Sequence, residues 1–443
     1  MNLADLGATQ LVQMIVDGEI SSLELVEACI GRIDEKEDEV HAWVHLDYDF
    51  ARKQAEQADA IRASGAPCGP LHGIPVGIKD IFDTDDYPTE NGTILDAGRK
   101  PDEDCAAVAR LKAAGCIIMG KTVTTELAVY SPGKTTNPHD MNRTPGGSSS
   151  GSAAAVACGM VPLAIGSQTN GSVIRPASFC GVVGFKPTHG SISRAGALRL
   201  SRNLDHVGVF ARSIEDAALI ADCLIGHDPK DPDTQIKSSS QLSVTTAEEP
   251  PLEPKFAFIK TPVWDQAETA TKEAFEKLAE FLGDGCVEVS LPDVFDTVTE
   301  DLHKVMIADL AKNLGRYYRK GKEQLSDILC GMIEEGQSVT AVDYNASIDN
   351  RAKLNSWIQG ICSEYDAIIT PAAIGEAPMG LNTTGDPIFC TLWTYLGVPA
   401  VTVPLMTGEN DMPLGVQVVS SVGDDARLLR SARWLVKKVV SEG

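Results

Sequence analysis

Glycine and serine gather in two clusters between residues 142 and 188, and they limit what this part of the chain can fold into. The first cluster spans residues 146–151 and opens an Ala-rich run, and the second spans residues 166–172 and follows an apolar run. Glycine lets a backbone approach a ligand closely, and serine beside it serves as a helix cap or a nucleophile. The pattern predicts two loops, joined by a short buried helix and strand, that face each other across one pocket.

Elsewhere short apolar runs alternate with amphipathic stretches, which is typical of an α/β fold. Val26, Ile30 and Ile33 recur at helical spacing behind the cap candidates Ser21 and Ser22. We expect helices within 3–36 and at 49–63, 103–114, 213–224, 266–282, most of 297–360 and 425–440. We expect strands at 73–80, 116–119, 256–259, 287–289, 367–370, 400–403 and 416–419.

Composition excludes several classes of protein. The net charge of -24 argues against a nucleic-acid partner, which needs a basic face. No apolar run reaches 18 residues, so we expect no membrane span. The 11 cysteines are dispersed, and the N-terminal residues do not resemble a signal peptide, so reduced thiols in a cytoplasmic protein are expected. The 8 histidines show no metal-binding spacing.

One short run matches the P-loop pattern. It extends from Gly115 to Thr122, with Gly120 and Lys121 at the required positions. The four residues between the glycines are Cys, Ile, Ile and Met, which favour a strand over a phosphate-binding loop. Nucleotide binding therefore remains an alternative, although the expected strand does not fit the loop that a phosphate site needs.

A second run, Gly147 to Gly151, matches the nucleophile elbow with Ser149 at its centre. An elbow follows a strand directly, whereas a turn containing Pro145 precedes this run. Asp205 and His206 are the available partners for a Ser-His-Asp hydrolase, which stays open as a second alternative.

Three motifs connect a lysine run with the two serine clusters in a fixed order. They read Gly77-Ile78-Lys79-Asp80, Gly146-Gly147-Ser148-Ser149 and Thr169-Asn170-Gly171-Ser172. Together with the paired N-terminal helices and the runs 180–188 and 413–417, they resemble the amidase signature family over nearly the whole chain. The resemblance implies an α/β fold with a mixed β-sheet core flanked by α-helices. It also implies one domain over 1–443, with N-terminal helices at 1–64, a signature core at 65–227, a surface loop at 228–254 and a remainder at 255–443.

The resemblance implies a catalytic triad of two serines and a lysine. Ser172 corresponds to the nucleophile, Ser148 to a bridging serine on a cis peptide bond, and Lys79 to the base. The chemistry is consistent, because a serine hydroxyl attacks an amide poorly unless a base takes its proton. A lysine accepts that proton only when neutral, and burial tunes catalytic lysines toward pKa values of about 7–8. In a strand Asp80 points away from the side chain of Lys79, so it need not hold the lysine protonated.

The remaining site residues surround this triad. The backbone N–H groups of Thr169, Asn170, Gly171 and Ser172 are expected to form the oxyanion hole, where one donor contributes roughly 3–4 kcal/mol. Ser149 and Gln168 are expected to support the site or to contact substrate. Arg175 makes either a structural ion pair or a clamp for a substrate carboxylate.

One departure from the family pattern bears on the substrate. Many members, including the glutaminase subunit of the tRNA-dependent amidotransferase, read Asp-Thr-Gly-Gly-Ser where this chain has Gln168, Thr169, Asn170, Gly171 and Ser172. The change favours the stand-alone amidases, which act on small amides, ureido compounds and carbamates as urethanases do. We expect carbon–nitrogen bond hydrolysis through a serine acyl-enzyme without cofactor or metal, in a possible homodimer, and the alternative is the glutaminase subunit. The pocket walls are expected from residues 124–140, 297–345 and 374–396, with Tyr130, Phe389, Trp393 and Tyr395 as aromatic candidates.

Overall fold

One mixed sheet of eleven strands runs through the computed structural model, which describes residues 2–236 and 241–442. The strand order is β1-β3-β2-β4-β6-β5-β10-β11-β9-β7-β8. The strands are β1 (Trp43–Leu46), β2 (Pro75–Lys79), β3 (Ile117–Thr122), β4 (Leu163–Gln168), β5 (Val183–Lys186), β6 (His206–Ala211), β7 (Phe256–Phe258), β8 (Cys286–Glu288), β9 (Ala367–Pro371), β10 (Ala400–Thr407) and β11 (Pro413–Val419). The mixed α/β architecture predicted from the sequence is therefore confirmed.

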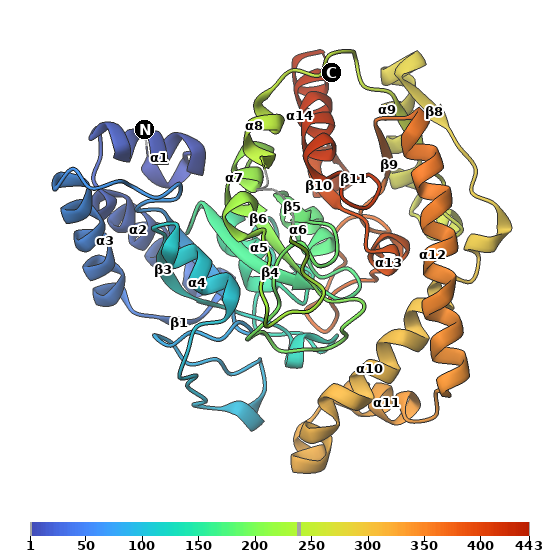
Figure 1. The fold of residues 1–443 in the computed structure, drawn as a ribbon, viewed down its shortest axis with the longest axis horizontal. Coiled ribbons are helices and arrows are strands. Elements are labelled where there is room, and N and C mark those ends of the chain that lie inside the picture. The colour runs from blue at the N-terminus through green and yellow to red at the C-terminus, as the bar shows by residue number, and fades with distance from the viewer. Residues whose placement is uncertain (1, 237–240, 443) are drawn as a thin grey trace.

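Helices surround this sheet (Figure 1). The helices are α1 (Ala8–Asp17), α2 (Ser22–Val40), α3 (Tyr48–Ala63), α4 (Ala106–Ala113), α5 (Ser150–Ala157), α6 (Ile174–Cys180), α7 (Ile214–Leu224), α8 (Leu242–Ala247), α9 (Thr269–Leu282), α10 (Val298–Gly321), α11 (Asp327–Gly336), α12 (Ala341–Glu364), α13 (Ile388–Leu396) and α14 (Asp425–Glu442). Figure 1 places α1 to α3 at one end of the molecule and α10 to α12 at the other. None of the helices in the described part of the chain is long and apolar enough to cross a membrane.

Local signals explain where the predicted helices begin. Ser21 caps α2 through a capping box, in which its side chain accepts from the Glu24 N–H and the Glu24 carboxylate accepts from the Ser21 N–H. Ser213 caps α7 by accepting from the N–H of Asp216. The apolar stripe of α2, including Val26 and Ile33, is fully buried. Periodicity and capping together therefore fixed these elements.

The strand pairing determines which loops meet. β2 lies parallel to both β3 and β4, with Ile78 paired to Lys121 on one side and to Ile165 on the other. Since parallel strands end at the same edge of a sheet, the residues that follow β2 and β4 come together there. Lys79 ends β2, and the second glycine-serine cluster begins in β4.

Some elements differ from the sequence prediction. The surface loop expected at 228–254 contains the short helix α8, in which Leu242 and Thr246 are buried. The polar composition of that stretch concealed the helix, and residues 237–240 lie outside the described part of the chain. The strands β1 and β6 and the helix α13 were not predicted. α13 is buried on nearly all sides, so it lacks the periodicity that marks an amphipathic helix.

Candidate active site

Lys79 lies at the buried centre of the candidate site. Its side chain is fully buried at the end of β2. The Nζ atom donates to Ser148 Oγ at 2.7 Å and to Ser167 Oγ at 2.9 Å. The peptide bond between Gly147 and Ser148 is cis, in agreement with the arrangement that the family resemblance implies. The structure therefore joins the predicted base to the predicted bridging serine.

Electrostatics at this position favour the neutral amine. Burial lowers the pKa of Lys79 well below its usual range, and the negative charge of Asp205 opposes part of that lowering. The neighbouring Asp80 is engaged elsewhere, because its carboxylate lies 3.1 Å from Lys121 Nζ and accepts from the N–H of Glu90. Asp80 therefore does not hold Lys79 protonated, as the alternation along the strand predicted.

Ser172 stands between β4 and α6 and lines a small cavity. It lines this cavity together with Thr169 and Asn170. Within residues 2–236 and 241–442, no hydrogen bond joins the Ser172 hydroxyl to Ser148 or to Lys79. The structure thus links Lys79 and Ser148 directly and places Ser172 on the wall that faces the cavity.

Side-chain contacts hold the loop of the predicted oxyanion hole from several sides. Gln168 Oε1 accepts from the N–H groups of Val173 and Ile174 at 2.8 Å and 2.9 Å. Thr169 Oγ1 donates to Asp205 Oδ1 at 2.7 Å. Asn170 Oδ1 accepts from Thr391 Oγ1 at 2.9 Å. Such fixed contacts keep the loop in one conformation, as a preorganised donor site requires.

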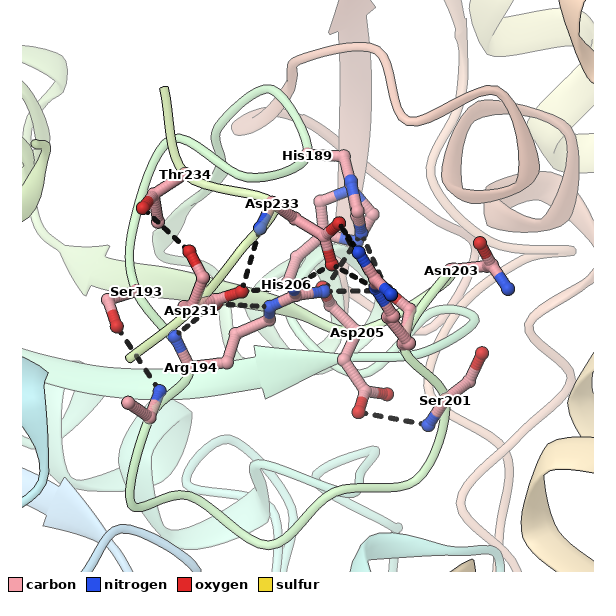
Figure 2. A network of polar contacts seen from close by, with 12 residues as sticks. His189, Ser193, Arg194, Ser201, Asn203, Asp205, His206, Asp231, Asp233 and Thr234 are labelled. Atoms are coloured by element: carbon pink, nitrogen blue, oxygen red, sulfur yellow. Dashed lines mark hydrogen bonds and ion pairs between the residues drawn. The ribbon is translucent and has the colours of Figure 1, made fainter. Parts of the chain in front are cut away.

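Asp205 connects this loop to a wider polar network. Its carboxylate also accepts from the N–H groups of Leu200 and Ser201, each at 2.9 Å. Figure 2 shows the contact with Ser201 beside the ion pairs of Arg194. Burial raises the pKa of Asp205 to about 6, although these three hydrogen bonds act in the opposite direction. Sequence reasoning named Asp205 only as a partner for an elbow serine.

Arg175 joins the two glycine-serine clusters. Its guanidinium donates to the carbonyl of Gly147 at 2.6 Å and to the carbonyl of Thr384 at 2.7 Å. Its backbone N–H donates to the carbonyl of Gly171 at 3.0 Å. Within the described residues Arg175 makes no ion pair, and its Nη1 atom has no hydrogen-bond partner. The structural ion pair considered from the sequence is therefore wrong, because backbone carbonyls take the place of a carboxylate.

Ser149 supports the site instead of forming an elbow. Its hydroxyl donates to the carbonyl of Ser167 and accepts from the N–H of the same residue, both at 3.2 Å. His206 Nδ1 faces the carbonyl of Leu204 at 2.6 Å, and neither it nor Asp205 contacts Ser149 within the described residues. The geometry of a Ser-His-Asp triad is therefore missing.

The P-loop alternative also loses its structural basis. Residues 117–122 form β3, as the apolar composition indicated. Lys121 Nζ is buried and donates to the carbonyls of Phe82 and Pro88 and to Thr89 Oγ1. Since these contacts and Asp80 occupy the ammonium group, it is not available to a phosphate.

A small cavity at Ser172 adjoins a larger one. The inner chamber has a volume of ≈ 20 Å³, and a wider vestibule of ≈ 480 Å³ shares Tyr130, Asn170 and Met306 with it. The chamber is lined by Ala128, Val129, Tyr130, Thr169, Asn170, Ser172, Leu200, Met306 and Leu310. Apart from Asn170, the vestibule walls come from the three segments expected from the sequence. Of the four aromatic candidates only Tyr130 lines either cavity, because Phe389, Trp393 and Tyr395 are buried in the core.

Among the described residues, one group of three carboxylates could hold a metal ion, formed by Asp85, Asp86 and Asp104. Lys112 Nζ lies between 2.5 and 2.7 Å from all three. This lysine supplies the positive charge that a metal would otherwise supply, and none of these residues lines the chamber or the vestibule.

Comparison with known proteins identifies the family. The amidase family matches residues 24–429. A glutamyl-tRNA(Gln) amidotransferase subunit from Chloroflexus aggregans is 34% identical over 93% of this chain and 92% of its own. The peptide amidase of Stenotrophomonas maltophilia has a TM-score of 0.85 and 26% identity, with 99% of this chain and 97% of that chain covered. The 6-aminohexanoate cyclic dimer hydrolase has a TM-score of 0.86 and 26% identity, with 99% and 98% covered. The chain therefore belongs to the amidase family and is a hydrolase of carbon–nitrogen bonds.

Proposed function

We propose that Ser172 is the nucleophile, Ser148 the bridging serine and Lys79 the base of the hydrolysis. The observation that carries this proposal is the fully buried Lys79 amine, which lies 2.7 Å from Ser148 Oγ in surroundings that favour its neutral form. A neutral lysine accepts a proton at neutral pH, whereas an ordinary surface lysine is already protonated.

The reaction proceeds in two halves. Ser172 Oγ attacks the carbonyl carbon of the substrate, while its proton passes to Ser148 and the proton of Ser148 passes to Lys79. The carbon–nitrogen bond then breaks, and the leaving nitrogen takes a proton back through Ser148 from Lys79. In the second half, water attacks the acyl-enzyme ester and gives its proton to the same pair of residues. The acid is released, and the Ser172 hydroxyl is restored.

The loop of residues 169–172 supplies the donors for the negative oxygen of the tetrahedral intermediate. Within the described residues, the N–H groups of Gly171 and Ser172 face no protein acceptor and are free to bind that oxygen. The contacts of Gln168, Thr169 and Asn170 hold these N–H groups in place before substrate arrives. Donors that need no rearrangement at the moment of reaction are the effective ones.

The walls of the chamber favour a substrate with a small, uncharged acyl group. None of its nine lining residues carries a charge, and most are apolar. An ion placed there would lose its hydration without gaining a partner of opposite charge. We therefore infer that a small amide, ureido compound or carbamate with an uncharged acyl side is the substrate.

One observation supports the glutaminase alternative besides the names of the relatives. The free Nη1 atom of the buried Arg175 is a donor suited to a carboxylate, and glutamine carries one. Arg175 does not belong to the lining of the chamber or the vestibule, so a substrate carboxylate would need a rearrangement to reach it. For this reason we place the amidase proposal first.

The test is amine or ammonia release from propionamide, a ureido acid, ethyl carbamate and glutamine by wild type, Ser172→Ala and Ser149→Ala. We expect turnover of a small uncharged substrate that Ser172→Ala abolishes and Ser149→Ala retains in part. A mass increase on Ser172 during turnover would show the acyl-enzyme. Undiminished turnover by Ser172→Ala would refute the triad, and turnover of glutamine alone would establish the alternative.

A further inference from the structure

A third cavity is separate from the chamber and the vestibule, with which it shares no lining residue. It has a volume of ≈ 320 Å³. Four arginines and one carboxylate contribute to its wall. The lining residues are Asp83, Asn91, Arg99, Arg194, Gly196, Ala197, Leu198, Arg199, Asn313 and Arg316. We call this cavity the arginine pocket.

Two of the four arginines are held by carboxylates. Arg99 makes a bidentate pair with Asp83, in which both nitrogen–oxygen distances are 2.7 Å. Arg194 contacts Asp231 at 2.7 Å and Asp233 at 2.5 Å, and Figure 2 shows it between these two side chains. These pairs fix the guanidinium groups in the wall, but they also neutralise much of their charge.

The other two arginines keep their charge. Arg199 and Arg316 are exposed, and neither makes an ion pair within the part of the chain that the structure describes. Arg316 lies over the ring of Tyr317, 4.8 Å from its centroid, and donates to the Tyr317 hydroxyl at 3.1 Å. These contacts hold its guanidinium in place without a negative partner.

The lining of the arginine pocket is positively charged, although the chain as a whole is acidic. Aspartate and glutamate number 62, whereas lysine and arginine number 38. Two cations that make no ion pair within the described residues nevertheless share one cavity. The formal charge of the lining is positive, because Asp83 is its one acidic residue.

We propose that the arginine pocket binds a small polyanion that carries a phosphate group. A guanidinium presents its N–H donors in a planar fork that matches two phosphate oxygens at once. Arg199 and Arg316 supply two guanidinium groups without an acidic partner among the described residues. Asn313, whose amide nitrogen donates to the Leu200 carbonyl, lies in the same wall. The volume is sufficient for a phosphate or a pyrophosphate group, and such a ligand would bind without occupying the chamber at Ser172.

The test is calorimetric titration of the full chain with pyrophosphate and, separately, with succinate in 0.1 M KCl. The variant is Arg199→Ala/Arg316→Ala, and the matched control is Arg319→Ala. Arg319 lies on the same helix as Arg316, is exposed, makes no ion pair within the described residues and does not line the pocket. Because all three side chains are exposed, each variant is expected to fold, and circular dichroism and thermal unfolding check this.

We expect pyrophosphate to bind wild type and Arg319→Ala alike, and the double variant at least tenfold more weakly. Binding to wild type should also weaken as the KCl concentration rises, because ion pairs are screened. Equal binding of pyrophosphate to wild type and to the double variant would overturn the proposal. So would the absence of binding to wild type at millimolar concentrations, or a preference for succinate over pyrophosphate.

Discussion

Replacing Thr169 by valine tests how the oxyanion loop is anchored. The substitution keeps the shape of the side chain and removes the hydroxyl that donates to Asp205 Oδ1 at 2.7 Å. Asp205 is buried, and its pKa is raised from an ordinary value of 3.8 to about 6. A shift of about 2 units corresponds to roughly 3 kcal/mol. Because the folded state holds this proton more tightly than the unfolded chain, wild type loses that stability as the pH rises from about 4 to about 6.

Removal of the Thr169 hydroxyl should increase the stability that is lost as the pH rises. A hydrogen bond contributes about 1.5–3 kcal/mol when its acceptor is charged and about 1 kcal/mol when it is neutral, so the pKa of Asp205 in Thr169→Val should rise further, by about 0.4–1.5. At pH 8 the free energy of unfolding of the variant should be about 1.5–3 kcal/mol lower than that of wild type. At pH 4 the carboxyl group is protonated in both proteins, and the difference should shrink to about 1 kcal/mol.

The assay is urea unfolding at pH 4, 6 and 8, followed by tryptophan fluorescence, together with kcat and KM for an active substrate. The matched control is Thr370→Val, because Thr370 is fully buried and its hydroxyl has no partner in the described structure. Its effect on stability should not change with pH. In Thr169→Val we also expect kcat to fall about tenfold or more with little change in KM, since the loop serves the transition state. The reasoning is refuted if the stability difference between Thr169→Val and wild type is the same at pH 4 and pH 8.

Three further substitutions test the surroundings of the triad. Lys79→Met should lower kcat by about 10²–10⁴. At neutral pH its free energy of unfolding should exceed that of wild type, because burial of a lysine with a lowered pKa costs stability, and this cost disappears as the pH rises toward 10.5. Steady-state kinetics measures the first effect, and urea unfolding between pH 6 and 10 measures the stability difference and its dependence on pH. Ser167→Ala removes one of the acceptors of Lys79 Nζ. Because this acceptor favours the charged amine, its loss should lower the pKa of Lys79, and the rising limb of the kcat/KM profile should move to lower pH. Gln168→Leu leaves the N–H groups of Val173 and Ile174 without their acceptor, and urea unfolding should show a loss of about 2–4 kcal/mol.

Local signals in the sequence predicted much of the fold, and the family resemblance predicted the central pair of the site. The capping serines and apolar periodicity predicted α7 almost to the residue and the start of α2, which continues to Val40, four residues beyond the expected end. The alternation along β2 correctly separated Lys79 from Asp80. The lysine and the first serine cluster were joined through family resemblance, and the structure shows Lys79 in direct contact with Ser148.

Long-range contacts explain what the sequence did not reveal. Ser167 lies 88 residues beyond Lys79, and only the parallel pairing of β2 with β4 brings the two side chains together. Asp205 stands 36 residues beyond Thr169, and the adjacency of β4 and β6 sets their contact. No short motif encodes such pairing, because it depends on the strand order of the whole sheet.

In the proposed mechanism, the buried ionisable groups around the serines act together near neutral pH. Burial favours the neutral amine of Lys79, whereas Arg175 stays charged because a guanidinium does not lose its proton in proteins. Asp205 is ionised above its pKa of about 6, so the resting site holds one positive and one negative charge. In the proposed mechanism Lys79 receives the proton of the nucleophile, and the Asp205 carboxylate would stabilise the new ammonium group, since its negative charge raises the pKa of Lys79. Burial alone would make Lys79 a weak base, and Asp205 restores part of its basicity while anchoring the loop that binds the oxyanion. A single carboxylate thus links the acceptance of the proton to the stabilisation of the negative charge that the same step creates.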